Sequence, residues 1–285
     1  MSVFKPPRLT QRLSRLGVST GGRFALSFKD LQTGEALFTG HGGIFPSASL
    51  IKLGILFATV ALADQGRLSM GDRVRVEPHT SAMAAQRQQK GSGVVARFCV
   101  SHHLTVAELC MLMTIISDNA AADLLVGALG RGTLNDVLAQ HGFVATRLTD
   151  DFADLEALED PGKNPTSAYE TMRLLELLYR GRRPGSLWAI DILKQQHLNS
   201  RLPLFLPQGV EVAHKTGTLV HTFHDAGIVY SPVGDYVLAI LTSDVPTRAR
   251  GELAIAGMSR LVYRSFLGRD TSVGPPTDRA GVPEE

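Results

Sequence analysis

The 285-residue chain has little of several features that mark special classes of protein. It contains two cysteines, Cys99 and Cys110, and one tryptophan, and neither sign of charge dominates, with 29 Lys and Arg against 27 Asp and Glu. Two cysteines are too few for a disulfide framework or a cysteine-based zinc site. We interpret them as two small core residues, although a single disulfide between them stays open.

The chain also lacks long apolar runs. No stretch approaches the roughly 20 apolar residues of a membrane helix, so we expect no membrane span. Basic residues occur within positions 1–16, but no apolar segment follows them, and no secretory signal is visible. Either the protein stays in the cytoplasm or the printed start lies downstream of an export signal. The interspersed charges predict no nucleic-acid partner.

What is present is typical of a folded domain, with 44 % hydrophobic and 20 % charged residues. Periodicity predicts strands near both ends of the chain and helices between them. The expected strands are 23–29, 36–39, 209–215, 226–231 and 236–242, and the expected helices are 7–16, 49–65, 105–114, 120–129, 132–141, 167–180, 187–198 and 252–266.

This order of elements predicts an α/β protein of the α+β type. An antiparallel sheet flanked by helices would be made from both ends of the chain, with an all-helical lobe inserted. We expect one catalytic domain over residues 1–267, and a flexible tail over 268–285. Its sheet lobe would comprise 17–45 and 205–267, and its helical lobe 46–204. A site made by both lobes would lie between them.

Three short motifs occur in order: Ser49-Leu50-Ile51-Lys52, Ser117-Asp118-Asn119 and Lys215-Thr216-Gly217, the last followed by Thr218. A serine hydroxyl is a weak nucleophile and needs a base. Residues three apart in the first turn of a helix share a face, so Lys52 should lie beside Ser49. Lys52 can take the proton of Ser49 if burial and nearby cations lower the pKa of its ammonium.

Together these motifs resemble the S-x-x-K, S-D-N and K-T-G set of class A β-lactamases and penicillin-binding proteins. The similarity covers about residues 23–266 and is closest to a divergent branch of class A-like serine hydrolases. It implies a β-lactamase/transpeptidase-like fold. We expect no cofactor, and no metal because no H-E-x-x-H or H-x-H-x-D pattern occurs. The resemblance assigns catalysis to Ser49, Lys52 and Ser117, and substrate binding to Asn119, Lys215, Thr216, Gly217 and Thr218.

The resemblance also implies a role for each group. The backbone N–H groups of Ser49 and Thr218 would form an oxyanion hole. Ser117 would pass a proton to the leaving nitrogen. Asn119 would hydrogen-bond Lys52 and a substrate amide. In the third motif, Lys215 would supply positive charge near Ser117 and the substrate carboxylate, and Thr216 or Thr218 would add hydroxyl contacts. Asp118 would brace its own loop.

The family's E-x-x-L-N loop is absent, and its glutamate is the base that activates the water for deacylation. The alignment puts Phe152 where that glutamate belongs. Asp151, Asp154 or Glu156 could replace it if the loop shifts by a residue, or all three could be surface acids. The sequence therefore predicts rapid acylation and slow turnover.

A second departure concerns the substrate carboxylate, which many family members bind with an arginine on the strand after K-T-G. Counting along the chain puts His224 at that position. A protonated histidine could bind a carboxylate, or the ring could be satisfied by neighbouring backbone, and both alternatives stay open.

The leading hypothesis is an enzyme that hydrolyses a small-molecule β-lactam, a cyclic amide, through an acyl-enzyme. A carboxylesterase or D,D-peptidase on the same scaffold is one alternative. A non-catalytic covalent sensor of β-lactams or peptidoglycan is another.

Overall fold

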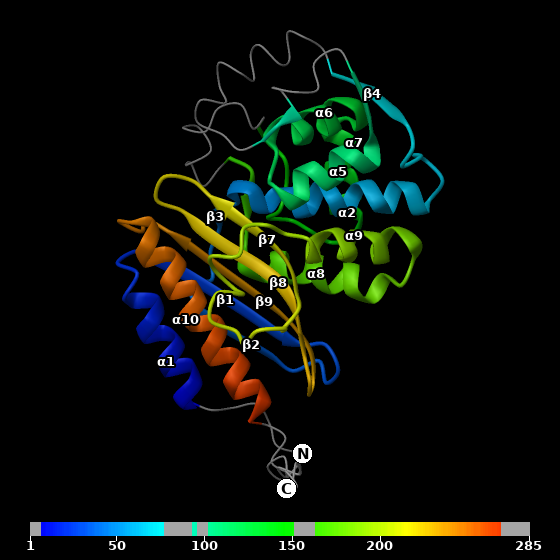
Figure 1. Cartoon of the computed structure of the whole chain (residues 1–285). Helices are drawn as coiled ribbons and strands as arrows, with labels where there is room; N and C mark the ends of the chain where they lie inside the picture. Colours follow the sequence, from blue (N-terminus) through cyan, green and yellow to red (C-terminus); the bar gives the residue numbers. More distant parts are fainter. Residues whose placement is uncertain (1–6, 77–92, 96–101, 151–162, 269–285) are drawn as a thin grey trace, which may run out of the picture.

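The computed structural model describes residues 7–76, 93–95, 102–150 and 163–268. Its centre is a five-stranded antiparallel sheet in the order β2-β1-β9-β8-β7 (Figure 1). Both ends of the chain contribute to it, as the sequence predicts. The strands are β1 (Arg23–Asp30), β2 (Ala36–Gly40), β7 (Val212–Thr218), β8 (Phe223–Ser231) and β9 (Gly234–Ser243).

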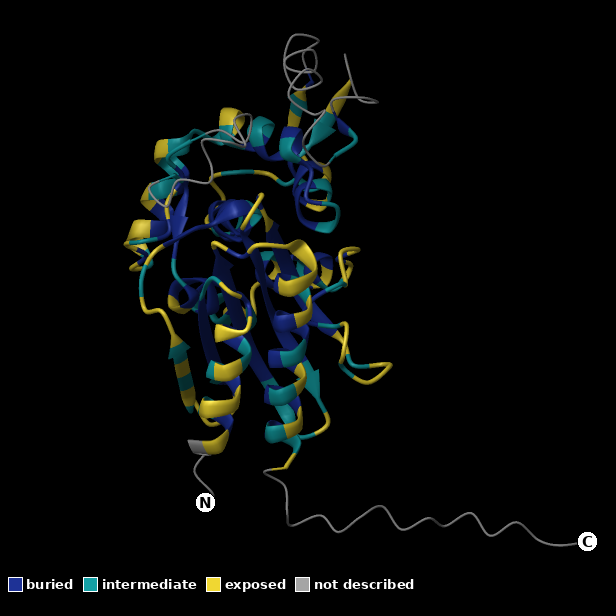
Figure 2. Ribbon diagram, turned by 90° about the vertical axis from the view of Figure 1, so that its left-hand side faces the viewer, coloured by how far each residue is buried: buried dark blue, intermediate teal, exposed yellow. Residues whose placement is uncertain are grey.

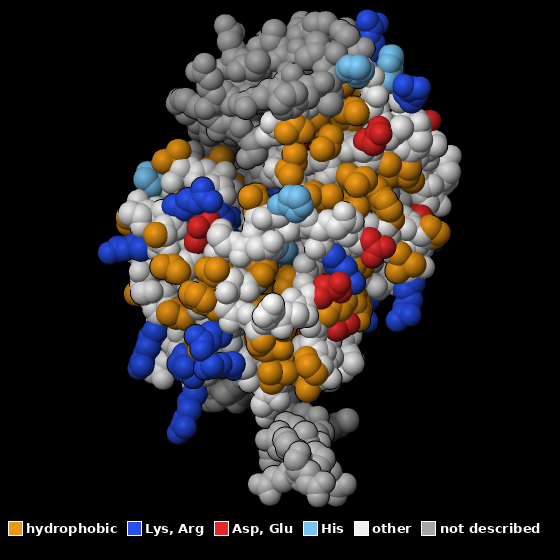
Figure 3. All heavy atoms as spheres, in the orientation of Figure 1, with side chains coloured by type: hydrophobic (Ala, Val, Ile, Leu, Met, Phe, Trp, Pro, Cys, Tyr) orange, Lys and Arg blue, Asp and Glu red, His pale blue; other side chains and the backbone are white. Residues whose placement is uncertain are grey.

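Helices cover both faces of this sheet. On one face α1 (Pro7–Val18) and α10 (Arg248–Leu267) lie side by side (Figure 1). Figure 3 shows Lys and Arg side chains gathered over these two helices, where Arg8, Arg12 and Arg264 are exposed to water. The other face packs against helices α2 (Ile51–Asp64), α5 (Val106–Ile115), α6 (Asn119–Leu129), α7 (Arg131–Gln140), α8 (Ala168–Gly181) and α9 (Pro184–Lys194), directly or through one another.

Strand β9 separates two hydrophobic cores. Because successive side chains of a strand point to opposite faces, Val237 and Leu241 lie in the core of the helical lobe, whereas Leu238 and Ile240 lie in the core beneath α1 and α10. Figure 2 shows the sheet buried between helices whose outer surfaces are exposed. A strand covered on both faces is apolar throughout, which is what the run 236–242 shows in the sequence.

Short elements join the two lobes near β7. The 3-10 turn η1 (Ala48–Leu50) precedes α2 and lies against β7. Before it, β3 (Phe45–Pro46) pairs with β6 (Pro165–Thr166). Within the helical lobe, β4 (Arg73–Arg75) pairs with β5 (His103–Thr105), and these strands contact α6 and α5.

The predicted α+β fold with its antiparallel sheet is confirmed, but several predicted boundaries are wrong. The helix expected at 187–198 is α9, which starts earlier because Pro184 fits the first helical position and fixes φ there. The helix expected from residue 49 begins as a 3-10 turn. Within the described ranges no helix is long and apolar enough to cross a membrane. The division of the chain at 17–45, 46–204 and 205–267 stays a prediction.

Candidate active site

Ser49 is the middle residue of η1 and is partly exposed. Two features fix this turn. Ala48 adopts a left-handed backbone, with φ of 49°, and the backbone N–H of Ser47 donates to the carbonyl of Asn164 at 3.0 Å. A Cβ atom at Gly217 of β7 would come within 3.1 Å of the Ser47 carbonyl oxygen. Glycine at this position therefore lets β7 approach the turn that carries Ser49.

Lys52 is in the first turn of α2 and only 1 % exposed. Its Nζ donates to the backbone oxygen of Ser117 at 2.7 Å, to Ser117 Oγ at 3.3 Å and to Asn119 Oδ1 at 2.6 Å. Burial removes water from the ammonium and lowers its pKa to about 7, although Asp118 and Asp123 offset part of the shift. An amine with such a pKa is neutral often enough at neutral pH to accept a proton.

The Ser117-Asp118-Asn119 motif links α5 to α6. Ser117 has a φ of 61°, a conformation that costs energy for a residue with a side chain. Asp118 caps α6, since its Oδ1 accepts the N–H of Ala121 at 3.0 Å and its Oδ2 accepts the N–H of Val95 at 2.9 Å. The bracing role expected of Asp118 is thus what its hydrogen bonds do.

Lys215 reaches the same serine from the sheet. It is 1 % exposed on β7, and its Nζ donates to Ser117 Oγ at 2.9 Å and to the backbone oxygen of Thr216 at 2.9 Å. Burial, together with the charge of nearby Lys52, holds the pKa of Lys215 well below its usual range. Ser117 Oγ therefore lies between two amines, one from each lobe.

Arg201 is a residue that the sequence analysis missed. Its side chain is 2 % exposed, and one guanidinium nitrogen donates to the carbonyls of Gly217 at 2.7 Å and His224 at 2.6 Å. The other donates to Thr218 Oγ1 at 2.6 Å and to Glu252 at 3.3 Å. An arginine is thus present at the end of β7, but it comes from the segment before that strand. No motif surrounds Arg201 in the sequence, so only the fold reveals it.

His224 does not fit the carboxylate-binding role expected for it, and we correct that expectation. The ring is fully buried, its Nε2 donates to the Pro46 carbonyl at 2.8 Å, and its Nδ1 accepts the N–H of Thr242 at 3.1 Å. Burial lowers the pKa of His224 to about 4. The structure agrees with the other alternative, a neutral histidine satisfied by backbone, which here joins β8 and β9 to β3.

Asp151, Asp154 and Glu156, the candidate bases for deacylation, lie outside the described residues, as does Phe152. The residues that flank them are tied together. Lys163 forms an ion pair with Asp150 at 2.6 Å, and the side-chain oxygen of Asn164 accepts the N–H of Thr149 at 2.8 Å. Because the Asn164 carbonyl also accepts from Ser47, both flanks are anchored beside the turn of Ser49.

Neither a reactive thiol nor a metal cluster adds to this site among the described residues. Cys110 is buried in α5 as a free thiol, and burial raises its pKa to about 12, whereas Cys99 lies outside the described residues. Across the ranges that the structure describes, no three His, Cys, Asp or Glu side chains gather as a metal site would require.

Known proteins that are similar to this chain include a β-lactamase sequence and two solved structures. Its residues are 30 % identical over 122 positions to a β-lactamase of Rhodobacter capsulatus, a match that covers 43 % of this chain and only 39 % of that protein. The structure of PBP-A as an L158E mutant, an acyl-enzyme complex with penicillin G, is 28 % identical with a TM-score of 0.82 and covers 94 % of this chain and 100 % of its own. An ancestral class A β-lactamase is 27 % identical with a TM-score of 0.78, over 90 % and 99 %.

Residues 8–266 match the β-lactamase enzyme family. The match spans nearly all of the described chain, including the three motifs. The chain belongs to this family and is a class A β-lactamase-like serine hydrolase.

Proposed function

We propose that this member of the β-lactamase enzyme family opens β-lactam rings through an acyl-enzyme on Ser49. The observation that carries the proposal is the position of Ser117 Oγ, 3.3 Å from Lys52 Nζ and 2.9 Å from Lys215 Nζ. One serine thus has an amine of lowered pKa on the side of the nucleophile and a second amine on the strand beside it. The acyl-enzyme of PBP-A with penicillin G supports the same chemistry on a similar fold.

Acylation begins when neutral Lys52 accepts the hydroxyl proton of Ser49. The serine oxygen attacks the lactam carbonyl carbon, and the backbone N–H groups of Ser49 and Thr218 stabilise the negative oxygen. The carbon–nitrogen bond then breaks, and the nitrogen takes the proton of Ser117. The Lys52 ammonium, which donates to Ser117 Oγ, restores that proton and becomes neutral again. The net change is one proton moved from Ser49 to the leaving nitrogen.

The substrate carboxylate would bind at the end of β7. Lys215 provides positive charge there, and Thr218 is exposed with its hydroxyl oxygen engaged by Arg201. Because that oxygen accepts from the guanidinium, the hydroxyl proton of Thr218 is directed elsewhere and can be donated to an anion. Thr216 and Gly217 continue the strand against which the substrate would lie, and Asn119, which accepts from Lys52, would contact its amide.

Deacylation would be slow. Water must attack the Ser49 ester with a base to take its proton, and the family's glutamate is replaced by Phe152. Asp151, Asp154 and Glu156 are the acids in the same segment that could serve. The acyl-enzyme would therefore accumulate before it is hydrolysed.

The test combines a chromogenic cephalosporin, a penicillin and a neutral short-chain nitrophenyl ester, with Ser49→Ala as the control. We expect a stoichiometric burst, slow turnover, and a protein that gains the mass of one penicillin. Mass spectrometry and absorbance follow both steps. If neither an adduct nor hydrolysis is observed, the proposal is wrong. Turnover of the ester alone would favour the carboxylesterase, and a burst without any turnover would favour the covalent sensor.

A further inference from the structure

We propose that His214 is a positioning residue: held as an imidazolium between Asp225 and Asn199, it sets the place of Arg201 beside Thr218. The inference rests on the proposed function, because it concerns how a substrate carboxylate is recognised. His214 precedes Lys215 on β7, so the two side chains point to opposite faces of the strand. The residue therefore acts on the site from behind the strand, without contact with the nucleophile.

Both ring nitrogens of His214 face oxygen atoms. The ring is 1 % exposed, with its Nδ1 at 2.9 Å from Asp225 Oδ1 and its Nε2 at 2.9 Å from Asn199 Oδ1. The orientation of the Asn199 amide follows from its own nitrogen, which donates to the Gln196 carbonyl at 3.0 Å. Turning the amide over would place two oxygens together at that carbonyl. The amide therefore presents its oxygen to the ring, and an oxygen of this kind only accepts.

A histidine with acceptors at both nitrogens must donate from both, and only the imidazolium form does so. The carboxylate of Asp225, which is fully buried, supplies the opposite charge. The surrounding charges come from several elements: Lys215 on β7, Arg201 on the segment before it, and Glu252 of α10, which pairs with Arg201 at 3.3 Å. His214 with Asp225 and Arg201 with Glu252 thus form two neighbouring pairs with no net charge.

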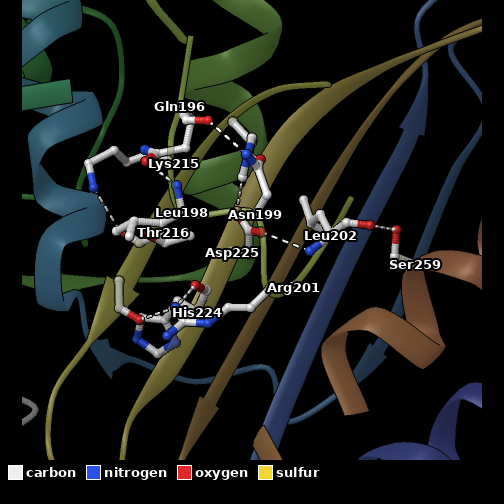
Figure 4. A network of polar contacts seen from close by, with 12 residues as sticks. Gln196, Leu198, Asn199, Arg201, Leu202, Lys215, Thr216, His224, Asp225 and Ser259 are labelled. Atoms are coloured by element: carbon white, nitrogen blue, oxygen red, sulfur yellow. Dashed lines mark hydrogen bonds and ion pairs between the residues drawn. The ribbon is translucent and has the colours of Figure 1, made fainter. Parts of the chain in front are cut away.

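The same carboxylate and amide fix the chain on both sides of Arg201 (Figure 4). Before it, Asn199 is held by the His214 ring. After it, the N–H of Leu202 donates to Asp225 Oδ2 at 2.9 Å, and the Leu202 carbonyl accepts from Ser259 of α10 at 2.8 Å. Arg201 lies between these two anchors, so its backbone has little freedom to shift.

The position of Arg201 in turn determines what Thr218 offers to a substrate. With its guanidinium on the Gly217 and His224 carbonyls, the side chain reaches Thr218 Oγ1 and turns the hydroxyl proton outward. Loss of the His214 charge would release Asn199 and allow Arg201 to move. Recognition of a substrate carboxylate would weaken, whereas Ser49, Lys52 and Ser117 would keep their places.

The experiment compares acylation by two substrates in the full chain: a penicillin, which carries a carboxylate, and a neutral short-chain nitrophenyl ester. For His214→Gln we expect the second-order rate constant with penicillin to fall about 10- to 100-fold, mainly through a higher KM. The ester rate should stay within about twofold. The matched control is His221→Gln, a nearby exposed histidine outside the network, which should keep both rates.

A second variant and an NMR measurement distinguish the proposed role of His214 from a simple loss of folding. Asn199→Ala removes one acceptor and leaves the buried pair intact, and it should cause the same selective loss. In the wild-type protein, ¹⁵N NMR should show hydrogen on both ring nitrogens of His214, assigned by its absence in His214→Gln. Equal losses with both substrates, no loss in Asn199→Ala, or a neutral ring would each overturn the proposal.

If the wild-type protein acylates with neither substrate, the proposed function fails, and the NMR signature still tests the imidazolium by itself. If acylation occurs but is not selective in the variants, only the role of His214 fails.

Discussion

The two faces of β7 bury positive charge in opposite ways. On the face toward the helical lobe, Lys215 and Lys52 lie near each other, donate to neutral oxygens of Ser117, Thr216 and Asn119, and have lowered pKa values. On the other face, His214 and Arg201 are matched with carboxylates. A buried amine that donates to neutral oxygens has its pKa lowered by desolvation and can act as a base, whereas a cation held in a close ion pair becomes a structural tie. The reactive amines thus lie on one face of β7, and the structural ion pairs lie on the other.

The largest expected effect comes from removing the Lys52 amine. Lys52→Met should lower the acylation rate by about 1,000-fold or more, because Ser49 loses its base. The same change should raise the free energy of unfolding at neutral pH, because it removes the desolvation cost that lowers the pKa of Lys52. Stopped-flow acylation and urea unfolding measure the two effects. A variant that loses stability would contradict the comparison.

Breaking the His214–Asp225 pair should change the free energy of unfolding in the opposite direction. Asp225→Asn leaves the buried His214 without its carboxylate partner, and we expect a loss of about 3–5 kcal/mol in the free energy of unfolding. Urea unfolding at neutral pH gives the value, and Asp235→Asn, at a partly exposed position, serves as the control. If Asp225→Asn were as stable as the wild type, the pair would not be a structural tie.

The smallest expected effect is the pH dependence that Lys52 gives to acylation and to stability. The folded pKa of Lys52, about 7, lies below its ordinary value of 10.5. Acylation should rise with pH up to about 7 and then level off as Lys52 becomes neutral. Between about 7 and 10.5 the unfolded chain binds more protons, so the contribution of Lys52 to stability should rise with pH. Comparing wild type with Lys52→Met from pH 5 to pH 10 isolates this contribution, and equal slopes would refute it.

The sequence predicts the general architecture well because helices and half-buried strands leave periodic patterns. The prediction is less accurate where both faces of a strand are buried. Strand β8 begins at Phe223, before the predicted start at 226. Its polar residues His224 and Asp225 are fully buried, and they interrupt the apolar pattern that would indicate a strand. The 3-10 turn at Ser49 gives no separate signal, because its residues continue the apolar pattern of α2.

The candidate site divides in the same way. Lys52, Ser117, Asn119 and Lys215 belong to compact motifs, and the structure brings them together. Arg201 and His214 act through backbone carbonyls, an amide and a buried carboxylate that are distant in the sequence. Counting along the chain from Lys215 therefore led to His224, whereas the arginine that meets β7 comes from the preceding segment.

Helix α2 is buried on nearly every side, in contact with each of α5, α6, α7, α8 and α9. Local unfolding of a helix enclosed in this way requires its neighbours to unfold as well. The hydroxyl of Ser49, in the turn before this helix, should therefore keep its position until the helical lobe unfolds cooperatively. On heating, the ability to form the penicillin adduct should disappear together with the native fold.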